Sequence, residues 1–114
     1  MIQIYHNPRC GKSRNCLAFL DENKQEYEII SYLTDTPTFD ELKELLKKLD
    51  LNPNQLVRTK EKIWIENYKN KNLTDEQTIQ AMVDNPILIE RPIVVKDGKA
   101  IIGRDLDKVA SFLD

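Results

Sequence analysis

The 114-residue chain contains few of the residues that cross-link or interrupt a fold: two cysteines, one histidine, three glycines and five prolines. Two cysteines cannot build the disulfide framework of a small secreted domain, and one histidine beside them gives too few ligands for a structural zinc site. No segment of biased composition and no internal repeat is visible, which argues against a disordered linker or a repeat array. We therefore expect no metal and an ordinary globular protein.

Long apolar runs are also missing, so no segment predicts a membrane span. Residues 2–5 have the pattern of a strand and not of a signal peptide, and we expect a cytoplasmic protein without a membrane partner. The net charge of -2 gives no general attraction to nucleic acid, so we expect no nucleic-acid partner either. Any anion would have to be bound by a local group of cations.

The composition, 40% hydrophobic and 32% charged, is typical of a soluble globular protein. A chain of this length fits one domain, because two pieces would each be too small to hold a core. The sequence therefore predicts a single domain over residues 1–114.

The two ends of the chain predict strands combined with helices. Residues 2–5 and 27–30 are strand-like and flank a predicted helix from about residue 12 to 22, which makes a β-α-β unit with parallel strands. Residues 92–95 and 99–102 flank Asp97-Gly98, a strong hairpin signal, and a last helix is predicted after them, with Asp105 as its N-cap.

The middle of the chain, about residues 35–85, is predicted to be helical. Capping boxes that begin at Thr38 and Thr74 start two of the helices, and shorter ones are indicated at Pro53 and over residues 60–67. The order is therefore β-α-β, several helices, then β-β-α. This order predicts an α/β, thioredoxin-like fold: a mixed sheet of about four strands, with a helical insert between its two halves.

Cys10 lies between the first strand and the first helix, a position with a chemical use. The free backbone N–H groups of residues 11–13 at a helix start favour an anion, and the same field lowers the pKa of a cysteine. Arg9, His6 and Lys12 add positive charge nearby. A cysteine in this position can also be a small buried hydrophobe, and a lone histidine more often completes a local hydrogen bond. The surrounding cations favour a reactive thiol.

The spacing of the cysteines excludes several other sites. A Cys-x-x-Cys dithiol needs cysteine at Ser13, and a Cys-x5-Arg phosphatase loop needs arginine at Cys16. Six residues along a helix separate Cys10 from Cys16 by roughly 9 Å and place them on different faces, too far apart for a disulfide. We predict two separate thiols: an attacking Cys10, whose resolving thiol comes from another molecule, and an inert, core-facing Cys16.

Three of the five arginines lie at the edges of predicted elements: Arg58, Arg91 and Arg104. The guanidinium group is always charged and donates two parallel hydrogen bonds, which suits a tetrahedral oxyanion. Most arginines are nevertheless solvated surface groups, and Arg14, within the first helix, is assigned to the surface. If Pro92 is the cis-proline that precedes the third strand of thioredoxin-like domains, Arg91 lies close to the attacking cysteine.

Two segments carry a family resemblance. Residues 4–14, Ile-Tyr-His-Asn-Pro-Arg-Cys-Gly-Lys-Ser-Arg, and residues 85–95, Asn-Pro-Ile-Leu-Ile-Glu-Arg-Pro-Ile-Val-Val, closely resemble the glutaredoxin-linked arsenate reductases, as do Leu56-Val57-Arg58 and Gly103-Arg104. The resemblance runs from residue 2 almost to the end of the chain. It implies a thioredoxin-like fold and reduction of arsenate to arsenite, with glutathione as co-substrate, glutaredoxin as partner, and no metal or tightly bound cofactor.

The resemblance also implies roles for single residues. The nucleophile of the family falls on Cys10, the histidine that helps to keep it ionised on His6, and the hydroxyl near the thiolate on Ser13. The oxyanion-binding arginines fall on Arg58, Arg91 and Arg104. Lys12 and Cys16 depart from the small or hydroxyl residues common in the family, and Cys16 leaves open whether a second thiol takes part.

Two other functions remain open. The Cys-Gly-x-Ser form is shared with monothiol glutaredoxins, so a general glutathione-linked thiol reductase is possible, although the Gly-Gly expected beside the proline is missing. The second alternative is a non-enzymatic, thiol-sensing regulator of the Spx type, which binds RNA polymerase. Those sensors typically carry a Cys-x-x-Cys switch, which Ser13 rules out in this chain.

Overall fold

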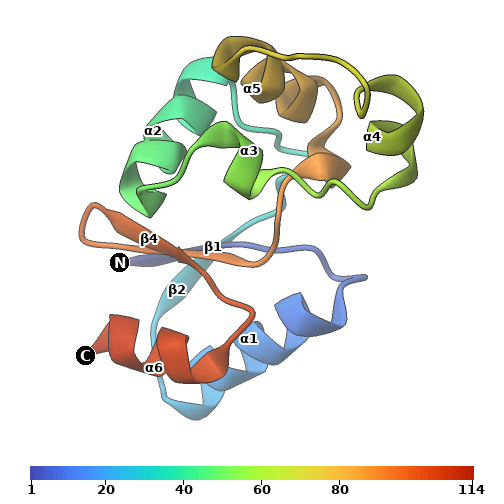
Figure 1. The fold of residues 1–114 in the computed structure, drawn as a ribbon. Coiled ribbons are helices and arrows are strands. Elements are labelled where there is room, and N and C mark those ends of the chain that lie inside the picture. The colour runs from blue at the N-terminus through green and yellow to red at the C-terminus, as the bar shows by residue number, and fades with distance from the viewer. The chain divides into compact units, whose positions relative to one another are not determined.

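The computed structural model describes all 114 residues, and they form two compact units (Figure 1). The first unit combines Met1–Asp35 with Arg91–Asp114, and the second is Thr36–Glu90. Whether residues 1–114 behave as a single domain stays a prediction. None of the helices has the length and apolar character needed to cross a bilayer.

The first unit is built on a four-stranded sheet with the order β2-β1-β3-β4. Its strands are β1 (Ile2–Tyr5), β2 (Tyr27–Ile30), β3 (Ile93–Lys96) and β4 (Lys99–Ile102). β1 pairs in parallel with β2 and antiparallel with β3, which pairs antiparallel with β4. The mixed four-stranded sheet and the α/β class predicted from the sequence are confirmed.

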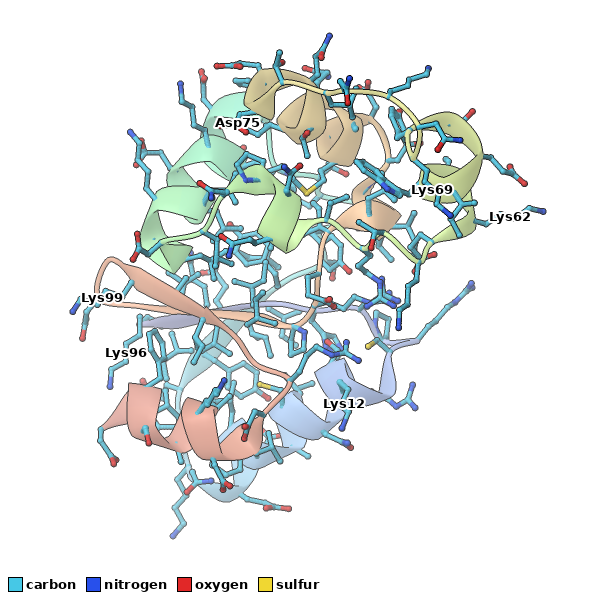
Figure 2. All side chains as sticks on the ribbon, viewed as in Figure 1. Lys12, Lys62, Lys69, Asp75, Lys96 and Lys99 are labelled. Atoms are coloured by element: carbon cyan, nitrogen blue, oxygen red, sulfur yellow. The ribbon has the colours of Figure 1, made fainter.

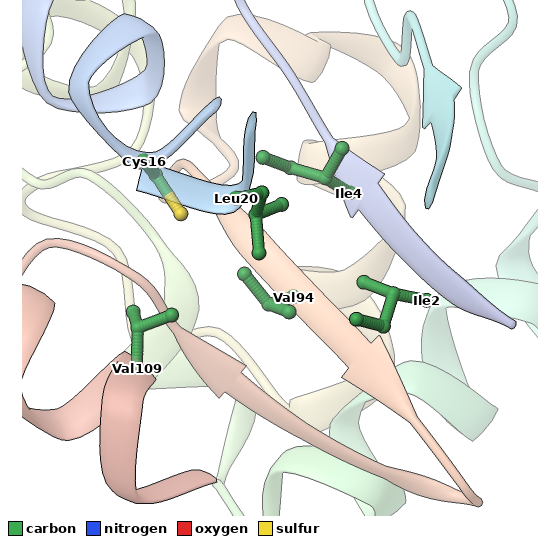
Figure 3. Packing of buried hydrophobic residues seen from close by; sticks show 6 residues of the cluster. All are labelled: Ile2, Ile4, Cys16, Leu20, Val94 and Val109. Carbon is green, nitrogen blue, oxygen red and sulfur yellow. The ribbon is translucent and has the colours of Figure 1, made fainter. Parts of the chain in front are cut away.

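Two helices, α1 (Gly11–Glu22) and α6 (Leu106–Leu113), lie on the same side of this sheet (Figure 1). They pack apolar side chains against strands β1 and β3, because burying one face of a sheet and one stripe of each helix removes both from water. Figure 3 shows the resulting cluster. Its fully packed members are Ile2, Ile4, Cys16, Leu20, Val94 and Val109.

The hairpin and the last helix follow from local sequence as predicted. Asp97 and Gly98 both have positive φ, 53° and 77°, which is the backbone that a two-residue hairpin turn requires. Asp105 caps α6 through its side chain, which accepts the N–H of Asp107 at 3.0 Å.

The regular elements of the second unit are helices, apart from one isolated bridge between Val57 and Ile89. It contains α2 (Phe39–Leu49), α3 (Pro53–Leu56), α4 (Lys62–Asn67), α5 (Asp75–Asp84) and a 3-10 turn, η1 (Pro86–Leu88). Both predicted capping boxes are present, one starting at Thr38 and the other at Thr74. The turn η1 was not predicted: Pro86 ends α5 but, since proline fits the first position of a helix, also begins the new turn.

Two boundaries that matter for the site differ by one residue from the prediction. α1 begins at Gly11, so that Cys10 is its N-cap, and β3 begins at Ile93 because Pro92 has no N–H to donate to a neighbouring strand.

Candidate functional site

The site begins with the loop between β1 and α1. Within it the N–H of Cys10 donates to the carbonyl of Asn7 at 3.0 Å, and the N–H of Arg14 donates to the carbonyl of Cys10 at 3.0 Å. Cys10 has an extended backbone, and its side chain does not cap the helix. Its partly exposed thiol is thus available at the positive end of a 12-residue helix.

Three hydrogen-bond donors meet the sulfur of Cys10. Burial by itself raises the pKa of this thiol, but the backbone N–H of Ser13, the side chain of Arg91 and the backbone N–H of Lys12 lower it further than burial raises it. The positive charge of Arg91 acts in the same direction. The pKa of Cys10 is therefore below its ordinary value, which increases the fraction of the nucleophilic thiolate.

His6 and Ser13 form a buried pair beneath the loop. The Nδ1 atom of His6 lies 2.6 Å from the Oγ atom of Ser13, and this Oγ also accepts the backbone N–H of Asn7 at 3.0 Å. All three residues are buried. The hydroxyl of Ser13 thus holds the loop, while its backbone N–H is the group that reaches the thiol of Cys10.

The hydroxyl of Ser13 accepts from Asn7 and still has one proton and one lone pair. It can therefore pair with either neutral tautomer of His6, by donating to an unprotonated Nδ1 or by accepting from a protonated one. Burial, followed by the charge of Arg14, lowers the pKa of His6. His6 is therefore neutral at pH 7, and not one of the positive charges expected around Cys10.

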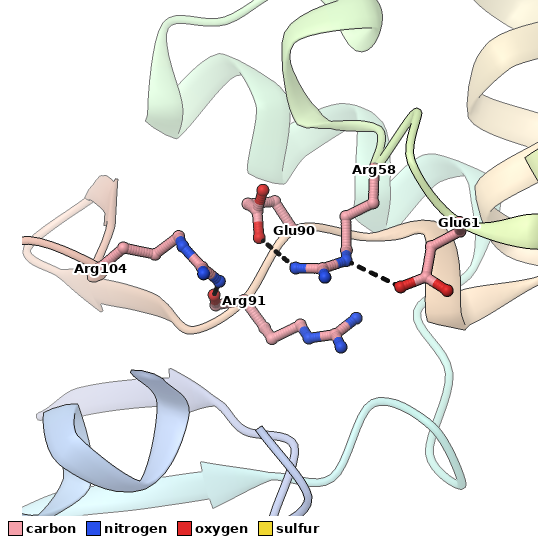
Figure 4. A network of polar contacts seen from close by, with 5 residues as sticks. All are labelled: Arg58, Glu61, Glu90, Arg91 and Arg104. Atoms are coloured by element: carbon pink, nitrogen blue, oxygen red, sulfur yellow. Dashed lines mark hydrogen bonds and ion pairs between the residues drawn. The ribbon is translucent and has the colours of Figure 1, made fainter. Parts of the chain in front are cut away.

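Arg91 reaches Cys10 from the other half of the first unit. The Arg91-Pro92 peptide bond is cis, and β3 follows it directly. The residue is only 8% exposed, and arginine is rarely buried unless it has polar partners; the thiol of Cys10 is one of them. Arg104 lies close by, since its Nη1 atom donates to the carbonyl oxygen of Arg91 at 3.1 Å (Figure 4). The structure thus brings two of the three predicted arginines together.

Arg58 belongs to the second unit and has two carboxylate partners there (Figure 4). Its Nε atom lies 3.1 Å from Glu61, and its Nη1 atom 2.8 Å from Glu90. Burial lowers the pKa of Arg58, but both carboxylates raise it, and the net shift is upward. Its backbone N–H donates to Leu88 at 2.7 Å. Sequence reasoning did not identify either carboxylate, although Glu61 lies at the i+3 spacing that signals an ion pair.

Two further residues near Cys10 complete the description. Arg14, which was assigned to the surface, is exposed but folds back on the loop, because its Nη1 atom donates to the carbonyl of Pro8 at 2.9 Å. No sequence signal pointed to this bond, because it joins residues six apart across the turn that leads into α1. Cys16 is fully buried, with a pKa raised by burial to about 11, and makes no disulfide, as predicted.

The structure therefore divides the predicted site residues between the units. Five of them lie in the first unit: His6, Cys10, Ser13, Arg91 and Arg104. Arg58 is in the second. No group of three or more histidine, cysteine, aspartate or glutamate side chains is placed to hold a metal ion.

Comparison with known proteins identifies relatives along the whole chain. The Escherichia coli protein named "Uncharacterized protein YfgD" is 49% identical over 114 residues, covering 98% of this chain and 96% of its own. A protein named arsenate reductase from Neisseria meningitidis serogroup A is 40% identical over 114 residues, covering 98% and 97%.

The solved structures agree with the sequence comparison. A structure named arsenate reductase from Vibrio cholerae superposes with a TM-score of 0.91 at 41% identity, covering 96% of this chain and 95% of that one. The similarity confirms the thioredoxin-like fold. The family model described as "ArsC family" matches residues 5–112, which include Cys10 and all three predicted arginines, and the chain belongs to the ArsC family.

Proposed function

We propose that this protein is an arsenate reductase in which Cys10 is the nucleophile, and that glutathione and a glutaredoxin supply the electrons. The observation that carries the proposal is the convergence of two backbone N–H groups and Arg91 on one accessible thiol whose pKa they lower. The relatives that are named arsenate reductase support the choice of substrate. The proposal includes a cytoplasmic location, where glutathione is abundant.

The proposed reaction transfers two electrons to arsenic. The Cys10 thiolate attacks As(V), forms an S–As bond and displaces an oxygen as water. The thiol of glutathione then displaces a second oxygen as water. A glutaredoxin thiolate attacks the glutathione sulfur, the As–S bond to glutathione breaks, and its electron pair remains on arsenic, which becomes As(III). Water finally cleaves the bond to Cys10 and releases arsenite.

The arginines have different parts in this proposal. Arg91 donates to the sulfur of Cys10, so it can neutralise negative charge both on the thiolate and on an oxyanion under attack. Arg104, whose guanidinium group lies at the carbonyl of Arg91, is proposed to bind a second oxygen of the substrate. The role of Arg58 rests on the family resemblance alone, and replacement of Arg58 by alanine tests it separately.

The test is an assay of NADPH oxidation with arsenate, glutathione, glutaredoxin and glutathione reductase. We expect arsenate-dependent oxidation with the native protein and none with Cys10→Ser. Cys16→Ala is the matched control, because it removes the other cysteine, which is buried and has a raised pKa, and should leave turnover intact. Omission of glutaredoxin should abolish turnover if it is the immediate electron donor.

A general thiol reductase is the second candidate, because the thiol of Cys10 is accessible and its pKa is lowered. It predicts rapid glutathione-dependent reduction of hydroxyethyl disulfide with no arsenate present, and a rate that does not depend on Arg104. If that activity is rapid and arsenate produces no NADPH oxidation, the arsenate proposal is wrong and this second function replaces it.

A further inference from the structure

Three cations beside Cys10 have no anionic partner. The first 20 residues contain Arg9, Lys12 and Arg14 but no aspartate or glutamate, although the whole chain has a net charge of -2. All three side chains are exposed, and Figure 2 shows Lys12 at the surface near the start of α1. None of them takes part in an ion pair. Their charges are therefore available to a molecule that approaches the thiol.

Arg14 is held in place and not merely exposed. Its Nη1 atom donates to the carbonyl of Pro8 at 2.9 Å, while its Nη2 atom lies 3.8 Å from the position that a Cβ atom on Gly11 would take. Apart from the two chain neighbours, Cys10 and Lys12, and the backbone of the helix, no other heavy atom lies within 4 Å of that position. The guanidinium group of Arg14 is therefore the only group from elsewhere in the chain that approaches Gly11 so closely.

The guanidinium group lies toward the thiol and not toward the far end of α1. Arg14 follows Cys10 by four residues, and its side chain turns back onto the loop that carries Cys10, where it reaches the carbonyl of Pro8. A small thiol with a carboxylate a few bonds away from its sulfur can therefore turn that carboxylate toward Arg14 while the sulfur reacts at Cys10. An arginine side chain that is already hydrogen-bonded in place loses little conformational freedom when it binds a carboxylate. Its guanidinium group can donate two N–H bonds to the carboxylate oxygens.

We propose that Arg14, assisted by the charges of Arg9 and Lys12, binds a carboxylate of the small thiol or disulfide that reacts at Cys10. The site would then prefer anionic partners, such as glutathione with its two carboxylates, over neutral or cationic ones. The inference rests on the proposed reactivity of Cys10 and does not depend on arsenate being the substrate.

Disulfide exchange measures this preference without arsenate. The Cys10 thiolate attacks one sulfur of a disulfide, a new S–S bond forms, the old one breaks, and the second sulfur leaves as a thiolate with the electron pair. Three disulfides that differ in charge serve as probes: dithiodipropionate (anionic), hydroxyethyl disulfide (neutral) and cystamine (cationic). The rate of modification is followed by acid quenching and mass spectrometry of the peptide that contains Cys10.

The expected result is a selective change of rates. Arg14→Gln should slow the reaction with dithiodipropionate about 3- to 10-fold, leave that with hydroxyethyl disulfide unchanged, and accelerate that with cystamine. Arg14→Lys keeps the charge but lacks the paired N–H donors of the guanidinium group, so its rate with dithiodipropionate should lie between those of the native protein and Arg14→Gln. High salt should weaken the preference of the native protein. Lys99→Gln is the control, since Lys99 is also an exposed cation but lies in the hairpin, at the other end of the strands from the loop (Figure 2).

Three results would overturn the inference. One is equal slowing of all three probes by Arg14→Gln, which would mean that the reactivity of the thiol itself had changed. Another is an unaltered rate of the reaction between dithiodipropionate and the Arg14→Gln variant, which would mean that Arg14 does not bind the carboxylate of a small molecule. The third is no reaction of Cys10 with any of the probes. The two proposals can also be told apart. If arsenate produces no NADPH oxidation but disulfide exchange still depends on the charge of the probe, the proposed reaction with arsenate is wrong and this inference is supported.

Discussion

His6 offers a sharp test of the site, because it is the only histidine in the chain and its protonation can be followed without overlap. Burial and the charge of Arg14 lower its pKa below the ordinary value of 6.5. The unfolded chain takes up a proton at that ordinary value, whereas the folded protein does so only at a lower pH. The stability due to neutral His6 is therefore fully present above pH 6.5 and is lost as the pH falls through the folded pKa.

The size of the effect follows from one proton. Between the two pKa values the free energy of unfolding should decrease with a slope that approaches about 1.4 kcal/mol per pH unit. The geometry gives the reason: the imidazole of His6 is buried, with the hydroxyl of Ser13 at 2.6 Å from Nδ1, so a second proton would place a positive charge where water cannot solvate it.

The assay is urea unfolding as a function of pH for the native protein and for His6→Asn. The asparagine side chain can present an oxygen near the position of Nδ1 and accept from Ser13, but it does not titrate. We expect the slope below pH 6.5 to flatten in this variant. In the native protein, nitrogen-15 NMR at neutral pH should show one protonated and one unprotonated ring nitrogen, as in a neutral imidazole.

Two results would refute this reasoning: an imidazole with both ring nitrogens protonated at neutral pH, or identical pH slopes for the native protein and His6→Asn. Ser13→Ala provides a second variant that does not rely on titration. It leaves Nδ1 of His6 and the N–H of Asn7 buried without their partner, and each such group should cost about 1–3 kcal/mol of stability.

Three further predictions concern the thiols and their neighbours. Arg91→Met removes both a donor and a charge from Cys10, so the pKa of this thiol should rise, which is measured as an upward shift in the pH profile of alkylation by iodoacetamide. A short native-state alkylation should modify Cys10 and leave the fully buried Cys16 intact until the protein is unfolded, as mapped by mass spectrometry. Gly103→Ala should destabilise the protein by about 1–3 kcal/mol in urea unfolding, because the new Cβ would lie 3.0 Å from the sulfur of Cys16; Cys16→Ala in the same chain should recover part of the loss.

Much of the fold was predictable because its signals are local. The capping boxes at Thr38 and Thr74 bond within one turn of helix, and Asp97-Gly98 selects the hairpin by the backbone that these two residues tolerate. The alternation of residues 2–5 likewise depends only on near neighbours. Such interactions form between residues that are already close along the chain, so the sequence alone determines them.

The reactive cysteine was predictable from the sequence, but the contacts of its neighbours were not. The position of Cys10 between a strand and a helix predicts that backbone N–H groups reach its sulfur, and those of Ser13 and Lys12 do. The same sequence suggested a positively charged His6 and an Arg14 without a contact in the protein. It did not predict the buried hydrogen bond between His6 and Ser13 or the bond from Arg14 to the carbonyl of Pro8, because both depend on how the loop folds.

The sequence by itself determined the order of strands and helices, the accessible cysteine at a helix start and the family to which the chain belongs. Only the tertiary structure decided that Arg91 meets Cys10, that His6 pairs with Ser13, and that Arg58 lies between Glu61 and Glu90. The physical reason is the separation along the chain: Arg91 is some 80 residues from Cys10, and contacts of that kind form only when the strands pair and bring distant segments together.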